Sequence, residues 1–147
     1  MRYRSMLVTL AVIMSTGRVV MAQKPEPFSV TRLYTGADGL SHFEPIGPKF
    51  APVPGEPSTV TQSEAVPTKK SYFVRARPGF FSDWHNADVR RYVITISGRA
   101  EVEVTGGQKL EAEPGQIVLA EDLTGKGHTF RVLGNNDWVA LFVDFEK

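Results

Sequence analysis

The stretch PGFFSDWHNADVRRYVITISGRAEVEV, residues Pro78–Val104, carries the strongest structural signal in this chain of 147 residues. It begins with a Pro-Gly turn, continues through an aromatic run to His85, and ends in two strand-like blocks separated by Gly98. In the second block, apolar residues at 100, 102 and 104 alternate with charged residues at 99, 101 and 103. An alternation with period two predicts a strand that is buried on one face and solvated on the other.

A second strand-like region follows later in the chain. The turn Glu113–Gln116, which contains Pro114-Gly115, leads into the apolar run Ile117–Ala120, and a loop then brings the chain to His128. Further strand-like blocks are Ser71–Arg77, Tyr92–Ser97, Arg99–Thr105, Lys109–Glu113, His128–Leu133 and Trp138–Phe145. Turns that recur about every eight to twelve residues predict an all-β sandwich or small barrel.

The first of these regions resembles the first histidine motif of the cupin superfamily. That motif reads glycine, five residues, histidine, any residue, histidine, then a glutamate and a closing glycine. The matching positions are Gly79, His85 and Gly98. The second histidine is replaced by Ala87, and the glutamate position falls on Arg91, or on Tyr92 with the longer spacing.

The later region resembles the second motif of the same family. Gly115 matches, and His128 comes two residues late because of the insert Leu123–Gly127. In cupins the two motifs form hairpins of a small jelly-roll barrel, and their histidines point into it. The resemblance covers Ser71 to Glu146 and implies an all-β, cupin-like jelly-roll barrel for residues 71–147.

The first 22 residues have the pattern of a secretory signal. Two arginines precede an apolar run from Met6 to Thr16, which is too short to span a bilayer by itself, and Ala22 ends the segment before a cleavage point. We expect a secreted or periplasmic protein cleaved near Ala22, with an uncleaved amphipathic anchor as the alternative.

The composition limits the partners of the mature chain. Loss of three arginines with the signal leaves 14 of the 17 basic residues against 16 acidic ones, a net charge of −2. This balance gives no electrostatic footprint for nucleic acid, and we expect no membrane attachment after the signal is removed. The chain has no cysteine, so export would bring no disulfides.

Residues 23–70 are expected to contribute two short strands and an irregular N-terminal arm. The strands are Ser29–Tyr34 and Leu40–Glu44, and six prolines follow from Pro45 to Pro67. Proline at this density excludes a helix or a central strand, because each proline fixes φ and removes a hydrogen-bond donor. We predict a proline-rich arm that packs over the barrel, with a flexible linker as the alternative.

Three histidines, His42, His85 and His128, are the candidates for a metal site. Neutral imidazole binds divalent metals, and three imidazoles can hold Fe, Mn or Zn with positions left open for substrate. One hypothesis is therefore a centre of His85 and His128 that is completed by His42, or by a carboxylate such as Glu44 or Glu121.

Two further stretches resemble a group of small single-domain bacterial cupins without an assigned activity. They are D-G-L-S-H-F-E, residues Asp38–Glu44, and the loop E-D-L-T-G-K-G-H, residues Glu121–His128. This resemblance implies that His42 belongs to the site. The glycines on either side of Lys126 also allow backbone conformations that other residues avoid.

The alternative hypothesis is a pocket without a tightly bound metal. An inward Arg91 would place a fixed positive charge where a cation would bind, whereas the opposite strand register would turn Arg91 outward and Tyr92 inward. The candidate ligand-binding residues are His42, Phe81, Trp84, Arg91 and Tyr92. Aromatic walls with an inward arginine favour a small carboxylate or enolate, and Asp83 or Asp88 could orient His85.

These features predict a protein that holds a small, anionic organic ligand in the barrel, with His85 and His128 as catalytic residues for acid–base chemistry. The alternatives are a metal-dependent cupin enzyme, such as a dioxygenase or isomerase, and a non-catalytic binding or sensor module. A homodimer is also expected, because cupins are commonly dimers and the arm and the exposed sheet edge favour exchange between subunits.

Overall fold

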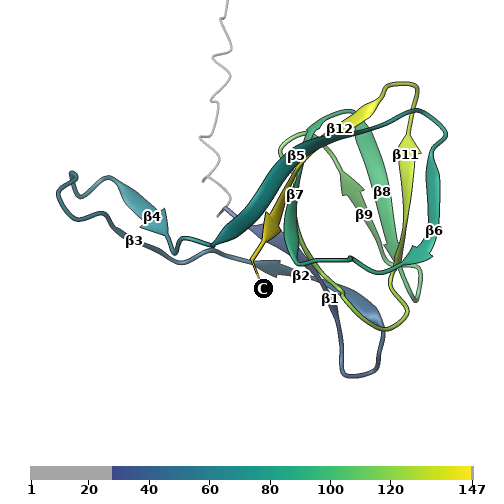
Figure 1. Ribbon diagram of the computed structural model, residues 1–147, viewed down its shortest axis with the longest axis horizontal. Coiled ribbons are helices and arrows are strands. Elements are labelled where there is room, and N and C mark those ends of the chain that lie inside the picture. Colours follow the sequence, from purple (N-terminus) through teal and green to yellow (C-terminus); the bar gives the residue numbers. More distant parts are fainter. Residues whose placement is uncertain (1–27, 147) are drawn as a thin grey trace, which may run out of the picture.

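The computed structural model describes residues 28–146, and all regular structure in that range is β-strand (Figure 1). The strands are β1 (Val30–Thr35), β2 (Ser41–Ile46), β3 (Phe50–Pro52), β4 (Thr61–Ser63), β5 (Thr68–Ala76), β6 (Phe81–His85), β7 (Arg91–Ser97), β8 (Arg99–Val104), β9 (Lys109–Ala112), β10 (Ile117–Glu121), β11 (His128–Leu133) and β12 (Trp138–Phe145). The predicted signal lies outside the described residues. Within those residues there is no helix that could cross a membrane.

Two sheets face each other and enclose the interior of the barrel (Figure 1). The larger sheet has six strands in the order β2-β1-β10-β7-β12-β5, and the smaller has four in the order β6-β11-β8-β9. Strands β1 and β10 run parallel, and the other neighbours in both sheets run antiparallel. The prediction of an all-β, cupin-like jelly-roll barrel is confirmed.

The alternating pattern of β8 places its apolar side chains inside the barrel, as the sequence predicted. Ala100, Val102 and Val104 are buried, while the charged residues between them lie on the outer face. Trp138 of the larger sheet packs edge-on against Phe130 of the smaller sheet, with 4.8 Å between the ring centroids. Contacts of this kind hold the two sheets together at one end of the interior.

One strand was not recognised in the sequence. The run after Pro78-Gly79 was interpreted as aromatic residues leading to a histidine, but it forms β6 at the edge of the smaller sheet. Its side chains are mostly exposed, so the burial pattern that marks an inner strand is absent there.

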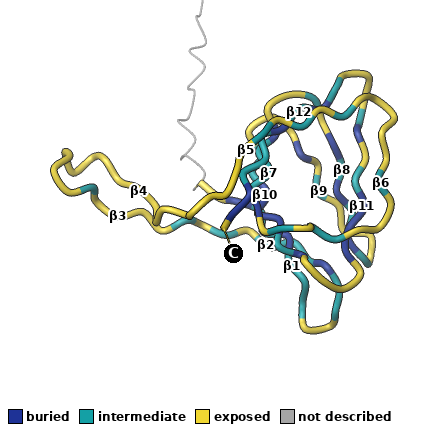
Figure 2. Tube along the Cα trace, in the orientation of Figure 1, coloured by how far each residue is buried: buried dark blue, intermediate teal, exposed yellow. Residues whose placement is uncertain are grey.

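The proline-rich arm differs from the expectation that it packs over the barrel. Strands β3 and β4 pair with each other as a hairpin that extends away from the barrel, and nearly every residue in it is exposed (Figures 1 and 2). The hairpin satisfies part of its own backbone hydrogen bonding, and its exposed side chains include the apolar residues Phe50, Val60 and Val66.

Candidate functional site

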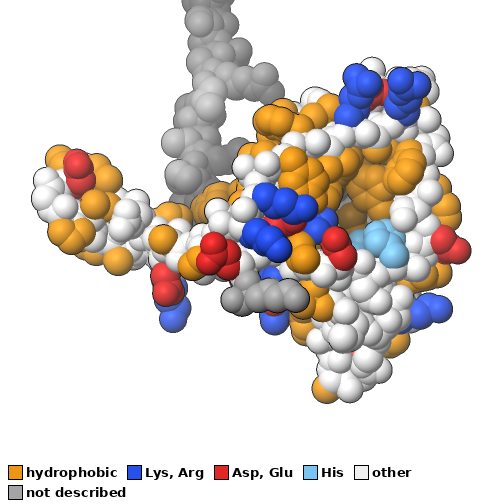
Figure 3. All heavy atoms as spheres, viewed as in Figure 1, with side chains coloured by type: hydrophobic (Ala, Val, Ile, Leu, Met, Phe, Trp, Pro, Cys, Tyr) orange, Lys and Arg blue, Asp and Glu red, His pale blue; other side chains and the backbone are white. Residues whose placement is uncertain are grey.

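An open cavity of about 800 Å³ lies between the two sheets. Figure 3 shows the hollow, with an apolar interior and a histidine at its edge. Apolar side chains from both sheets line it, among them Val74, Val93, Val118, Phe130, Trp138 and Phe142. Its volume falls in the range of roughly 300–1,000 Å³ that is usual for small-molecule sites.

His85 and His128 lie together on the cavity wall. His85 ends β6, His128 begins β11, and the two residues are opposite each other in the antiparallel register. Their ring centroids are 4.4 Å apart, with an angle of 53° between the ring planes. The structure therefore brings together the two histidines that the sequence placed at the matching motif positions.

A buried carboxylate orients His128. Nδ1 of His128 lies 2.7 Å from Oδ2 of Asp122, whose side chain is 0% exposed. The same oxygen accepts a hydrogen bond from Oγ of Ser41 at 3.0 Å. Because an ionised carboxylate oxygen only accepts hydrogen bonds, this contact favours the tautomer with hydrogen on Nδ1 and leaves Nε2 with its lone pair.

His85 is oriented by the backbone of its own strand. Its Nδ1 lies 2.7 Å from the carbonyl oxygen of Asp83 and 3.2 Å from Oγ of Ser82. A carbonyl oxygen only accepts, so Nδ1 of His85 also carries the hydrogen. In both rings, Nε2 is the nitrogen that remains free to meet a ligand.

The loop between β10 and β11 fixes the spacing of the two histidines. Gly127 has φ of +78°, and a Cβ added there would lie 2.1 Å from the carbonyl oxygen of His85. The amide of Asn86 donates to the carbonyl oxygens of Asp122 and Thr124. The segment that follows His85 is therefore hydrogen-bonded to the loop that precedes His128. A glycine is needed at position 127 because a side chain there would collide with the backbone of His85.

Arg91 points into the barrel and Tyr92 points away from it, which decides between the two registers left open by the sequence. Arg91 lines the cavity, is 9% exposed, and has Nε 2.9 Å from Oδ1 of Asp144. A second carboxylate, Asp88, lies 2.5 Å from its NH2 group. Tyr92 instead packs against Phe145 on the other face of the sheet, with ring centroids 4.9 Å apart.

His42 does not join the other two histidines. It lies beside Tyr34 in the register of β1 and β2, and its Nε2 contacts both oxygens of Asp38 at 3.0 Å. This hydrogen bond from His42 lowers the pKa of the Asp38 carboxyl below its ordinary value. Because Leu33 points inward, its neighbour Tyr34 and the paired His42 point outward.

The carboxylates considered as further metal ligands are also elsewhere. Glu44 and Glu121 both form ion pairs with Arg32, and Glu121 also pairs with Arg90 at 2.6 Å. In residues 28–146, no three His, Asp or Glu side chains lie close enough to form a metal site. The hypothesis that His42, Glu44 or Glu121 completes a three-ligand centre is therefore wrong for this structure.

Phe81 and Trp84, like Tyr92, are predicted aromatic ligand-binding residues that do not line the cavity. Phe81 is covered by the guanidinium of Arg131, and Trp84 by the ammonium group of Lys126. On β6 the inward position belongs to Ser82, so its neighbour Phe81 faces out. Phe80, which precedes the strand, is the aromatic residue that lines the cavity here.

Asp122 and Ser41 were not predicted from the sequence as members of the site. A signal for Asp122 was present, because it continues the inward alternation of Val118 and Ala120 on β10. An acidic residue on the inner face of an apolar strand needs a polar partner, and His128 is six positions further on. For Ser41, no comparable local pattern exists.

A scan against models of known protein families gives no match, and a search of curated proteins gives none either. Solved structures show a partial likeness. A cupin-like protein from Thermotoga maritima is 17% identical with a TM-score of 0.44, over 51% of this chain and 55% of that one. A cupin-2 domain containing protein from Shewanella frigidimarina is 13% identical with a TM-score of 0.41, over 52% of this chain and 69% of that one.

A third structure covers more of the chain. An RmlC-like cupin protein from Desulfovibrio desulfuricans is 10% identical with a TM-score of 0.37, over 90% of this chain and 97% of that one. Likenesses of this strength say nothing about ligand or reaction. The two facing sheets, which carry both histidines on their inner wall, agree with the jelly-roll barrel that the two histidine motifs predicted.

Proposed function

We propose that this protein binds a small, largely apolar organic molecule in the barrel and transfers a proton on it with His85 and His128. One observation carries the proposal. The buried contact between Asp122 and His128 lies directly beside His85, on the wall of an apolar cavity of about 800 Å³. A buried carboxylate that orients an imidazole toward a ligand cavity is an arrangement suited to general acid–base catalysis.

In this mechanism His128 is the general base. Its Nε2 accepts a proton from a carbon or oxygen of the bound molecule, and Asp122 stabilises the imidazolium that forms, because it already accepts the Nδ1 hydrogen. His85, with its own Nδ1 held by a carbonyl oxygen, is placed to exchange a proton at a neighbouring atom. A positioned base of this kind contributes roughly 10²–10⁴-fold to a rate.

The reaction class that fits is proton abstraction next to a carbonyl group, as in isomerisation or elimination. Apolar walls strengthen the interaction of a developing charge with the histidine pair. The cavity has room for a ring or a short branched chain together with the one polar group that meets the histidines.

A divalent Fe, Mn or Zn was the alternative cofactor, and the donor set does not fit it. The described cavity wall offers two imidazole nitrogens, whereas a catalytic metal site of this kind uses about three protein ligands. Asp122 cannot serve as the third in this arrangement, because it already binds Nδ1 of His128 and the hydroxyl of Ser41.

Proton–deuterium exchange tests the proposal without a known substrate. A panel of aryl ketones and arylpyruvates is incubated with the protein in D₂O, and loss of the α-proton signal is followed by NMR. We expect exchange above the buffer rate for at least one compound, and loss of that exchange in His128→Ala. His42→Ala is the matched control, because His42 lies outside the cavity, and it should exchange at the wild-type rate.

Two results would contradict the proposal. If exchange is as fast in His128→Ala as in the wild type, His128 is not the base. If compounds bind in the cavity without exchange in any of them, the second candidate, a non-catalytic binding or sensor module, is favoured instead.

We also place the mature protein outside the cytoplasm, in the periplasm or the medium, because of the signal pattern in residues 1–22. Mass spectrometry of the exported fraction should give a chain that begins after Ala22. An exported chain with an intact Met1 would contradict cleavage.

A further inference from the structure

The surroundings of Arg91 are unusual for a nearly buried arginine. Its guanidinium lines the cavity and is 11% exposed, and two carboxylates approach it from different sides. Asp144 is buried at 3% exposed, whereas Asp88 is 79% exposed. The two carboxylates therefore differ greatly in how firmly their surroundings hold them.

The inner ion pair uses little of the donor capacity of Arg91. Nε of Arg91 and Oδ1 of Asp144 are 2.9 Å apart, yet their orientation is not that of a hydrogen bond, and both atoms are buried without another hydrogen-bond partner. Asp144 also lies 3.6 Å from the ammonium group of Lys70. Arg91 and Lys70 together carry two positive charges, and Asp144 balances one of them. If Asp88 moved away, the cluster at the cavity wall would keep an excess positive charge.

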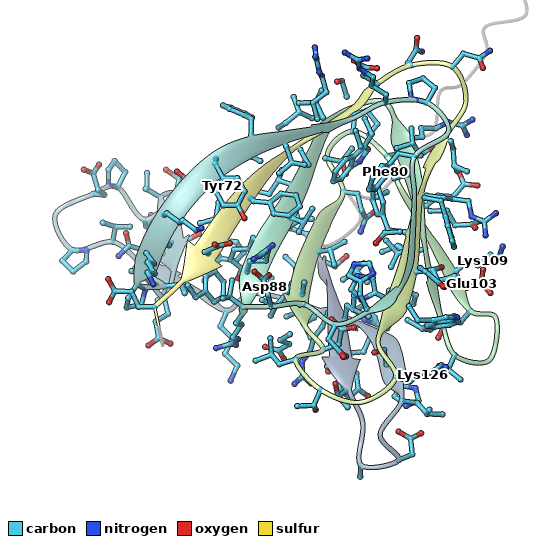
Figure 4. All side chains as sticks on the ribbon, turned by 45° about the vertical axis from the view of Figure 1, so that its right-hand side comes forward. Tyr72, Phe80, Asp88, Glu103, Lys109 and Lys126 are labelled. Atoms are coloured by element: carbon cyan, nitrogen blue, oxygen red, sulfur yellow. The ribbon has the colours of Figure 1, made fainter. Side chains whose placement is uncertain are left out.

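Asp88 is the movable member of this cluster. It belongs to the short segment between β6 and β7, and its side chain lies mostly in solvent at the open side of the barrel (Figure 4). The Asp88 carboxylate keeps most of its contact with water, so it loses little when it separates from Arg91, and a ligand carboxylate in its place would keep the guanidinium paired. A ligand carboxylate that arrives through the cavity could replace it at little cost.

The geometry points to Arg91 as the anchor of a carboxylate on the ligand, with Asp88 as an internal counterion that the ligand carboxylate displaces. A planar guanidinium binds a carboxylate through two parallel hydrogen bonds, so Arg91 would fix both the charge and the orientation of the ligand. The ligand class is then a small carboxylic acid with an apolar body, such as an aromatic or branched-chain acid.

This assignment rests on the proposed function, because it places the carboxylate in the same cavity as the histidine pair. The segment from His85 through Asn86, Ala87 and Asp88 to Arg91 lines one continuous wall. A molecule whose carboxylate binds Arg91 would extend its apolar body along that wall, toward His85 and His128.

Binding of matched acids and amides tests the assignment. Benzoate, phenylacetate and 3-phenylpropanoate are compared with their primary amides by calorimetry or ligand-detected NMR. We expect the wild type to prefer the acids over the amides. In Asp88→Asn, which removes the competitor and a like charge, the acids should bind about fivefold more tightly, while the amides should change little.

Two arginine variants serve as the comparison. Arg91→Lys keeps the charge beside Asp144 and should lose the preference for acids, since an ammonium group cannot make the paired hydrogen bonds. Arg99→Gln changes an exposed arginine on the outer face of β8, outside the cavity, and should bind as the wild type does. Thermal unfolding of each variant confirms that it is folded.

Equal binding of acids and amides in the wild type, or a preference for acids that is the same in Arg91→Lys as in Arg99→Gln, would overturn the assignment. Absence of binding by all six compounds to both the wild type and Asp88→Asn would also overturn it. The proton-exchange assay uses neutral ketones as well, so exchange that needs His128 can persist when the carboxylate preference fails. The two proposals therefore fail separately.

Discussion

Replacement of Gly127 by alanine should destabilise the barrel more than any ordinary turn substitution. Gly127 has φ of +78°, and an added Cβ would lie 2.1 Å from the carbonyl oxygen of His85. Real Cβ atoms keep at least 3.0 Å from such a neighbour, so the backbone would have to move by about 0.9 Å. That movement would separate the loop before His128 from the end of β6.

The size of the effect follows from two contributions. A non-glycine residue at positive φ costs about 1–2 kcal/mol. A forced shift in a packed region costs about 1–3 kcal/mol more. Gly134→Ala is the matched control, because Gly134 has φ of +74° and nothing within 4 Å of the added Cβ. It should lose only the first contribution.

Urea unfolding gives both numbers. We expect the free energy of unfolding to fall by about 2–5 kcal/mol in Gly127→Ala and by about 1–2 kcal/mol in Gly134→Ala, with the denaturant dependence unchanged in both. Histidine ring signals in the NMR spectrum should shift in Gly127→Ala alone. If the two variants lose equal stability, the loop does not press against His85 as described.

Three further outcomes are expected. Asp122→Ala should lower the free energy of unfolding by about 1–3 kcal/mol in urea, because Ser41 and His128 lose the oxygen that accepts from both of them, and a loss below about 0.5 kcal/mol would contradict the contact. The protein purified without chelator or nickel should hold much less than one metal ion per chain, and a stoichiometric metal that disappears in His85→Ala would restore the metal hypothesis. Light scattering should give a homodimer, since Phe73 and Ile96 are exposed apolar residues on the outer face of the larger sheet. Phe73→Ser should weaken the dimer, and a wild-type monomer at micromolar concentration would contradict the expectation.

The fold could be predicted because its signals are local. Strands such as β8 and β10 show their burial in the period of their side chains, and glycine turns mark their ends. The position of β6 could not be predicted in the same way, since an edge strand with both faces exposed has no such period. The hairpin of β3 and β4 was hidden by its prolines, which argue against a strand wherever they occur.

Of the site, only the proximity of His85 and His128 could be predicted from the sequence. His85 and His128 ended up together because each lies at the end of a strand in the same sheet. The inward direction of Arg91 depends on a register that one residue can reverse, and the sequence left it open. His42 was misassigned because a family resemblance does not fix the face of β2 to which a side chain points. The role of Asp122 could be recognised only once the structure showed its contact with His128.

The tautomers of the two histidines decide whether His128 can act as the base. Long-range ¹H–¹⁵N correlation of the imidazole rings, assigned with His42→Ala, His85→Ala and His128→Ala, reports which nitrogen carries the hydrogen. At neutral pH we expect hydrogen on Nδ1 and a free lone pair on Nε2 in the neutral rings of both His85 and His128. Hydrogen on Nε2 of His128, with Nδ1 unprotonated, would contradict this expectation, because the nitrogen of His128 assigned as the base could not accept a proton.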